Sequence, residues 1–211
     1  MPTKNICIFG DSIAYGEWTH HLGWADQLQN TLQQKTLESK FTLYYFLYNL
    51  SIPGNTTEDV LKRFQIEAEA REPHIIIFAV GTNDSSCREK QNMPLVPSEV
   101  EGRVSPDRFR ENVRMLIDKA KHRTHMIVWI GLTGVDEART TPFETTYFSN
   151  ERIGTYDAII KEICAEYHVP HLDLLAMLQP QDLEDGLHPN KQGHDKLFHA
   201  VLDFLVEKQV I

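Results

Sequence analysis

The sequence predicts an α/β fold in which helices cover a mainly parallel, five-stranded sheet. Short apolar runs alternate along the chain with segments whose apolar residues recur at helical spacing. The run at 74–80, H-I-I-I-F-A-V, is apolar throughout, as expected for a strand covered on both faces. Parallel neighbours need crossover connections, which this alternation supplies. Five strands in such a rhythm favour a flavodoxin-like strand order.

The strands are identified by apolar runs that end at turn residues. The first run, 6–9, ends abruptly at Gly10, and the second, 41–48, is rich in aromatic residues. A fully apolar third run is followed by G-T-N-D, and two further runs complete the set. The five predicted strands are 6–9, 41–48, 74–80, 126–130 and 169–174.

The helices are identified by their period and by their start signals. Apolar side chains at positions 24, 25, 28 and 32 share one helical face. Thr57 followed by two acidic residues predicts an N-cap and an acidic first turn, and Ser105-Pro106 predicts a cap with proline at the first helical position. The predicted helices are 24–37, 57–72, 106–121, 149–167 and 189–207. Long loops precede residue 105 and occupy 132–148, and loops of this length tend to be functional.

Composition narrows the class of protein. The 211 residues suit one domain, 1–211, with a sizeable core. A formal net charge of −9 disfavours nucleic acid and anionic membranes as partners. The chain has no signal-peptide layout and no apolar run long enough to cross a bilayer, so we expect a cytoplasmic protein without membrane insertion. Three cysteines at unrelated spacings indicate reduced thiols.

The stretch K-N-I-C-I-F-G-D-S-I-A-Y-G places Ser12 directly after the first predicted strand. In open α/β sheets, ligands bind at the carboxyl ends of the strands. Gly10 and Gly16 let the backbone approach a substrate without an intervening Cβ. Ser12 is therefore a candidate nucleophile if the chain also supplies a base and oxyanion donors. Asp11 is expected to bind nearby backbone and stiffen the turn.

Among ten histidines, His188 is distinguished by Asp185, three residues earlier in E-D-G-L-H-P-N. A carboxylate at this offset can bind one ring nitrogen, fix the tautomer and leave the other nitrogen facing a nucleophile. Gly186 permits a bend between the two, and Pro189 suits the first turn of the last helix. The same spacing also fits an ordinary turn capped by Asp185, with His188 in a surface loop.

Other candidates for a base, a nucleophile or a metal ligand are weaker. Glu17 precedes His20 by three residues, but a nearby position does not by itself aim a ring at Ser12, so we interpret His20 and His21 as surface or substrate-facing. Cys87 has no adjacent histidine–acid pair. The remaining histidine spacings do not match a helical metal pair, so we expect no metal site.

Donors for a developing oxyanion follow two other predicted strands. Asn83 in G-T-N-D has a side-chain amide, and Gly54 after the second strand has an N–H unshielded by a Cβ. Taken alone, each residue is also typical of an ordinary turn. Together with the N–H of Ser12, they follow the carboxyl ends of parallel strands, so we expect them to converge at one edge of the sheet.

These blocks resemble those of the SGNH hydrolases, also called the GDSL esterase/lipase family. The four letters match Ser12, Gly54, Asn83 and His188 in the right order. The first block reads G-D-S-I, with Ile13 where the family name has leucine. Because the blocks run from near one end of the chain to near the other, the resemblance covers essentially the whole sequence.

The resemblance implies a three-layer α/β/α fold with a five-stranded flavodoxin-like sheet. It also implies a triad of Ser12, His188 and Asp185, with an oxyanion hole made by the N–H groups of Ser12 and Gly54 and the Asn83 side chain. The implied activity is hydrolysis of a small-molecule ester through an acyl-enzyme, without metal or organic cofactor. The family also contains carbohydrate deacetylases, thioesterases and lysophospholipases, among which this sequence does not choose.

An alternative from another class is a non-catalytic flavodoxin-like module that binds phosphate or flavin at the first loop. The phosphate-binding glycine motifs are absent from the sequence, and Asp11 would repel a phosphate. The loop 133–148 mixes polar and aromatic residues, which favours a modest polar ester over a long lipid. Candidates for lining a substrate pocket are Trp18, Phe143, Tyr147 and Phe148, whereas Trp24 is better explained as a core residue.

Overall fold

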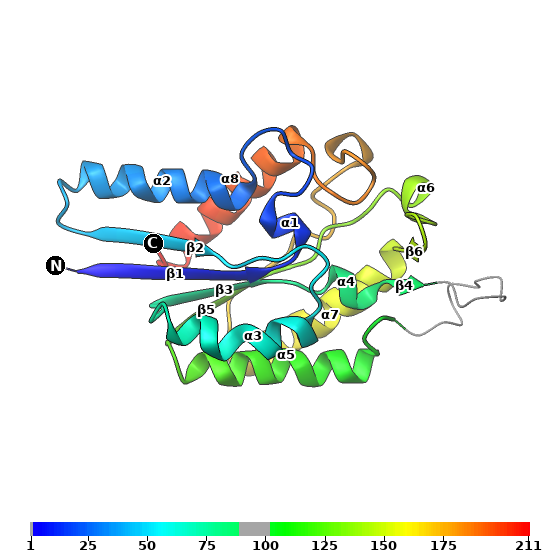
Figure 1. Cartoon of the computed structure of the whole chain (residues 1–211), viewed down its shortest axis with the longest axis horizontal. Helices are drawn as coiled ribbons and strands as arrows, with labels where there is room; N and C mark the ends of the chain where they lie inside the picture. Colours follow the sequence, from blue (N-terminus) through cyan, green and yellow to red (C-terminus); the bar gives the residue numbers. More distant parts are fainter. Residues whose placement is uncertain (1, 89–101) are drawn as a thin grey trace.

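Five parallel strands form the centre of the fold in the order β2-β1-β3-β5-β7 (Figure 1). The structure is a computed structural model that describes residues 2–88 and 102–211. The strands are β1 (Thr3–Gly10), β2 (Tyr44–Asn49), β3 (Ile75–Ala79), β5 (Met126–Ile130) and β7 (His171–Leu172). This is the flavodoxin-like order, so the topological switch point, where ligands bind in such folds, lies between β1 and β3.

Helices cover both faces of the sheet, which confirms the three-layer prediction (Figure 1). One face carries α2 (Trp24–Glu38) and α8 (Lys191–Glu207), and the other carries α3 (Thr57–Glu69), α5 (Pro106–Lys121) and α7 (Asn150–Tyr167). Alternate residues of β1 enter two separate cores, Ile6 and Ile8 on one side and Cys7 and Phe9 on the other. None of the helices in the described ranges has the length and hydropathy that a bilayer crossing requires.

Shorter elements lie in the connections between these strands and helices. They are α1 (Ser12–Tyr15), α4 (Thr82–Ser85), α6 (Glu137–Thr140), the 3-10 helix η2 (Pro180–Asp182) and an antiparallel ribbon of β4 (Cys87–Arg88) with β6 (Thr146–Tyr147). The loop predicted at 132–148 therefore contains α6 and β6. The polar loop predicted before residue 105 falls largely on residues 89–101, outside the described residues.

Three strands are shorter than the apolar runs predicted, and β3 lacks only one residue at each end. Phe41 has a left-handed backbone (φ 61°), which a strand excludes, so β2 begins only at Tyr44. Pro170 has no N–H that could donate to a neighbouring strand. After the strand, the Asp173 carboxylate accepts the N–H of Leu175 at 3.3 Å, which forms a turn. These residues confine β7 to two positions of the predicted run.

The N-cap of α3 and the first turn of α8 also differ from prediction. Thr56, not Thr57, is the N-cap of α3, because its side chain accepts the N–H of Asp59 and the Asp59 carboxylate accepts the N–H of Thr56 in return. Asn190 caps α8 through the N–H of Gly193, so Pro189 lies outside the helix rather than in its first turn. The observed N-cap of α3 is thus one residue earlier than predicted, and α8 begins two residues later than predicted.

Candidate active site

Ser12 lies where β1 ends and α1 begins. The Asp11 carboxylate accepts the N–H of Ile13 at 3.1 Å, which makes Asp11 the N-cap of α1 and holds the turn, as predicted. Gly10 allows other segments to approach, since a Cβ there would lie 2.7 Å from Ser51 Oγ and 2.9 Å from Ala79 O. Ser12 is thus held close to the loops that follow β2 and β3, with 8% of its surface exposed.

His188 and Asp185 form a hydrogen-bonded series with Ser12. His188 Nε2 lies 3.0 Å from Ser12 Oγ, and His188 Nδ1 lies 2.7 Å from Asp185 Oδ2. Burial raises the pKa of Asp185, but bonds from the His188 ring and from the N–H groups of His188 and Leu187 outweigh it and lower that pKa to about 2. The ionised carboxylate can only accept, so Nδ1 donates to it, and Nε2 of a neutral imidazole is then the nitrogen that can accept from the serine hydroxyl.

The loop that carries this pair is held by Arg139, a residue that the sequence reasoning did not single out as functional. Arg139 lies on α6 and pairs with Asp136 at 2.8 Å. Its guanidinium also donates to backbone oxygens of Pro180 (3.0 Å), Leu183 (3.2 Å) and Glu184 (2.9 Å). Gly186 has φ 97°, consistent with the predicted bend, and its carbonyl accepts the N–H of Asp136. No local signal marks Arg139, because its acceptors are carbonyls more than forty residues away.

The predicted oxyanion donors come from two adjacent turns. Asn55 N–H donates to Ile52 O at 3.1 Å, with Pro53 and Gly54 between them and Gly54 at φ 76°. These are the features of a type II turn. The Asn83 amide donates to Asn55 O at 3.2 Å, which joins this turn to the start of α4.

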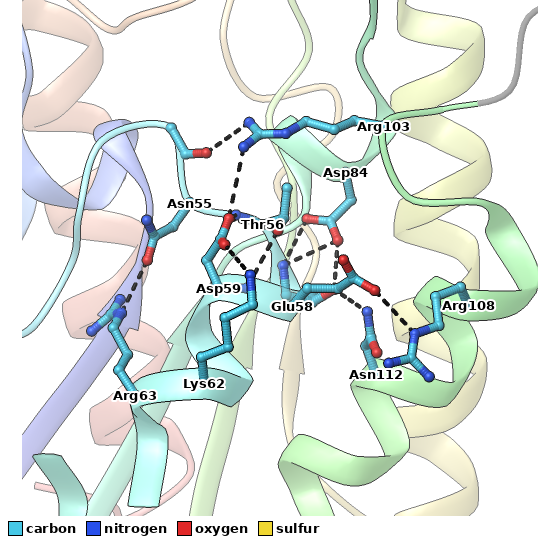
Figure 2. Close-up of polar contacts among 12 residues, drawn as sticks. Asn55, Thr56, Glu58, Asp59, Lys62, Arg63, Asp84, Arg103, Arg108 and Asn112 are labelled. Carbon is cyan, nitrogen blue, oxygen red and sulfur yellow. Dashed lines mark hydrogen bonds and ion pairs between the residues drawn. The ribbon is translucent and has the colours of Figure 1, made fainter. Parts of the chain in front are cut away.

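A buried carboxyl group, next in the chain to Asn83, joins α4 to α3. Asp84 is fully buried and accepts both the N–H (3.0 and 3.1 Å) and the hydroxyl of Thr57, while Asn112 donates to that hydroxyl at 3.0 Å (Figure 2). Burial raises the pKa of Asp84 to about 7, despite the bonds from Thr57. Burial also raises the pKa of Asp11 to about 6. Thr57, which was predicted to cap the helix, instead binds Asp84. Asp84 therefore has a structural role, as predicted.

The other histidine and cysteine candidates are either exposed on the surface or buried. His20 and His21 are exposed, and no bond joins either ring to Ser12. His194 is buried beside the site, where burial lowers its pKa to about 4, and its Nδ1 accepts the N–H of Trp24. Burial raises the pKa of the Cys87 thiol. The described residues contain no group of three or more side chains suited to a metal ion.

The aromatic residues considered for a pocket separate into two sets. Trp24 is buried in a core, as predicted, and Phe148 is buried in the other core instead of lining a pocket. Phe143 lies with its ring centroid 6.1 Å from that of His188, and Trp18 is 61% exposed. Trp18 and Phe143 border one open hollow beside Asp185, together with Thr19, His20, Glu144 and Glu184.

Comparison with known proteins identifies the family. A model described as the GDSL-like lipase/acylhydrolase family matches residues 8–196. The chain belongs to this family. This family assignment agrees with the resemblance found in the sequence. A curated relative, the uncharacterized lipoprotein YqeF of Bacillus subtilis (strain 168), is 33% identical over 124 residues, a match that covers 56% of this chain and 44% of the relative.

Several solved structures share the fold of this chain. A lipase/acylhydrolase from Enterococcus faecalis has TM-score 0.70 and 22% identity, covering 97% of this chain and 96% of its own. Axe2, an acetylxylan esterase from Geobacillus stearothermophilus, has TM-score 0.73 and 21% identity, covering 96% and 94%. TesA has TM-score 0.69 and 18% identity, covering 96% and 98%. At these identities the likeness establishes the fold.

Proposed function

We propose that the chain cleaves small carboxylic esters with Ser12 as nucleophile, His188 as general base and Asp185 as the acid that orients the base. The observation that carries this proposal is the continuous series from Ser12 Oγ to His188 to Asp185, with separations of 3.0 and 2.7 Å. Both separations allow direct hydrogen bonds, so the serine proton needs one transfer to reach the imidazole.

Acylation uses each of these groups in turn. His188 Nε2 takes the Ser12 proton while Oγ bonds to the ester carbon. The N–H groups of Ser12 and Gly54 and the Asn83 amide stabilise the oxyanion. The imidazolium, stabilised by Asp185, then protonates the leaving alcohol as the carbon–oxygen bond breaks. Water attacks the acyl-enzyme by the same route and releases the acid.

The hollow beside the proposed acid, Asp185, favours a short, polar ester. The open hollow beside Asp185 has exposed carboxylates as well as Trp18 and Phe143 at its border. Such a surface does not suit a long acyl chain, which needs continuous apolar burial. Acetylated sugars are short esters, and one structural neighbour is an acetylxylan esterase. Thioesters and lysophospholipids would use the same acyl chemistry and are the alternatives to test.

Covalent labelling with a fluorophosphonate probe tests the assignment without requiring the natural substrate. We expect label on Ser12 by mass spectrometry, loss of label in His188→Ala, and retention in the matched control His20→Ala. Each variant is checked for folding by circular dichroism. Absence of label from the folded wild-type protein would refute the nucleophile and favour a non-catalytic binding module. Loss of label in His20→Ala but not in His188→Ala would assign the base to the N-terminal loop.

A further inference from the structure

The proposed donor Gly54 has little packing to hold it. A Cβ at this position would meet no atom within 4 Å, and Gly54 is exposed. Gly54 has φ 76°, but glycine adopts negative φ values about as readily. A flip of the peptide that carries the Gly54 N–H would change this type II turn to type I. The position of this N–H therefore depends on how the whole turn is anchored to neighbouring segments.

Arg103, outside the turn, anchors it at the carbonyl of Gly54, one peptide beyond the N–H. Its guanidinium donates to Gly54 O at 2.9 Å and lies 3.7 Å from the carboxylate of Asp59, in the first turn of α3 (Figure 2). The Asp59 carboxylate is in turn held by the N–H and hydroxyl of Thr56. Arg103 is thus directed to the turn by an acceptor on the turn itself and by an anion just after it.

The backbone of Arg103 is attached to the segment that carries the second donor. Arg103 N–H donates to Ser86 O at 2.6 Å, and the next residue, Val104, donates to Asp84 O at 3.2 Å. Asp84 directly follows Asn83. Arg103 therefore spans the two turns, with its backbone on the Asn83 side and its side chain on the Gly54 side.

We propose that Arg103 is a positioning residue, which holds the Gly54 N–H and the Asn83 amide at the separation that an oxyanion requires. It acts through Gly54 and does not touch the substrate. This inference rests on the proposed function, because it assumes that these two donors serve the oxyanion. Arg63 supports the same turn more distantly, by donating to the Asn55 side chain at 3.0 Å (Figure 2).

The test compares Arg103→Ala with Arg108→Ala, a matched control. Arg108 is a neighbouring surface arginine that pairs with Glu58 at 3.1 Å (Figure 2). It also pairs with Glu111 at 3.0 Å, and its side chain bonds to neither donor turn. For para-nitrophenyl acetate, we expect Arg103→Ala to lower kcat about tenfold with KM within about twofold. This is less than the ~10²–10³-fold loss from deleting a donor, because the N–H group remains. Arg108→Ala should match the wild type.

Inhibition by a short alkylboronic acid separates a positioning role from a merely structural one. The boron accepts the Ser12 oxygen and becomes a negatively charged tetrahedral centre that resembles the intermediate. We expect the inhibition constant to rise in Arg103→Ala by the same factor as kcat falls, and Arg103→Lys to recover part of both. Arg103→Lys also serves if the alanine variant does not fold.

Three results would overturn the inference. One is a kcat for Arg103→Ala within twofold of the wild type, and another is an equal loss in Arg108→Ala. The third is a lower kcat with unchanged boronic acid affinity, which would place the effect outside the oxyanion hole. Failure of wild-type Ser12 to react with the fluorophosphonate would instead refute the proposed function, so the two failures are distinguishable.

Discussion

Replacing Arg139 with alanine removes the side chain that holds the loop carrying Asp185 and His188. The guanidinium donates to three carbonyls of that segment at 2.9 to 3.2 Å and is oriented by Asp136. Arg139 does not border the open hollow beside Asp185. We therefore expect the variant to lower kcat for a short ester while leaving KM nearly unchanged.

The size of the loss follows from these three bonds. A bond from a charged donor is worth about 1.5–3 kcal/mol when buried, but the Arg139 side chain is 39% exposed, so water compensates for much of it. At roughly 0.7 kcal/mol each, the three bonds contribute about 2 kcal/mol. If the loop alone loses this free energy, the fraction of molecules with His188 in place, and with it kcat, falls by up to about 30-fold.

Steady-state hydrolysis of para-nitrophenyl acetate measures both constants, and the rate of fluorophosphonate labelling reports Ser12 reactivity independently. Arg110→Ala is the matched control, because Arg110 forms a surface pair with Glu162 at 2.8 Å, away from the site. Arg139→Lys keeps the charge but cannot reach all three carbonyls, so it should be intermediate. A kcat for Arg139→Ala within twofold of wild type would show that Arg139 does not hold His188 in place, as would a loss no larger than that of Arg110→Ala.

Three other predictions concern the oxyanion donors, the buried carboxyl group and the substrate. Asn83→Ala should lower kcat by roughly 10²–10³-fold, the usual effect of removing one donor, and a change under about threefold in a folded variant would exclude Asn83 from the hole. Because the pKa of Asp84 rises from 3.8 to about 7 on folding, its contribution to the free energy of unfolding is full below about pH 4 and lost as the pH rises through 7. Melting temperatures of Asp84→Asn should therefore depend less on pH over this interval than those of the wild type or of the exposed control Asp203→Asn, and parallel curves would contradict this. In a series of para-nitrophenyl esters from acetate to laurate, kcat/KM should be highest for the shortest acyl groups, whereas a maximum at laurate would indicate a lipid substrate.

The sequence by itself was sufficient for the strand order and for the candidate positions. Apolar runs and helical periods depend on neighbouring residues, so they are visible in a linear pattern. Parallel strands end at one edge of the sheet, so residues that follow different strands meet there without further information. This topological argument placed Ser12, Gly54 and Asn83 near one another before any contact was known.

The tertiary structure decided which polar side chains pair across long separations. The sequence could not decide between His188 in a surface loop and His188 facing Ser12, a contact across 176 residues. Thr57, predicted as a helix cap, binds Asp84 because Thr56 takes the cap position. Arg139 and Arg103 donate to backbone carbonyls, an acceptor that every residue has. A sequence does not show which carbonyl a side chain will reach, because packing of distant segments determines it.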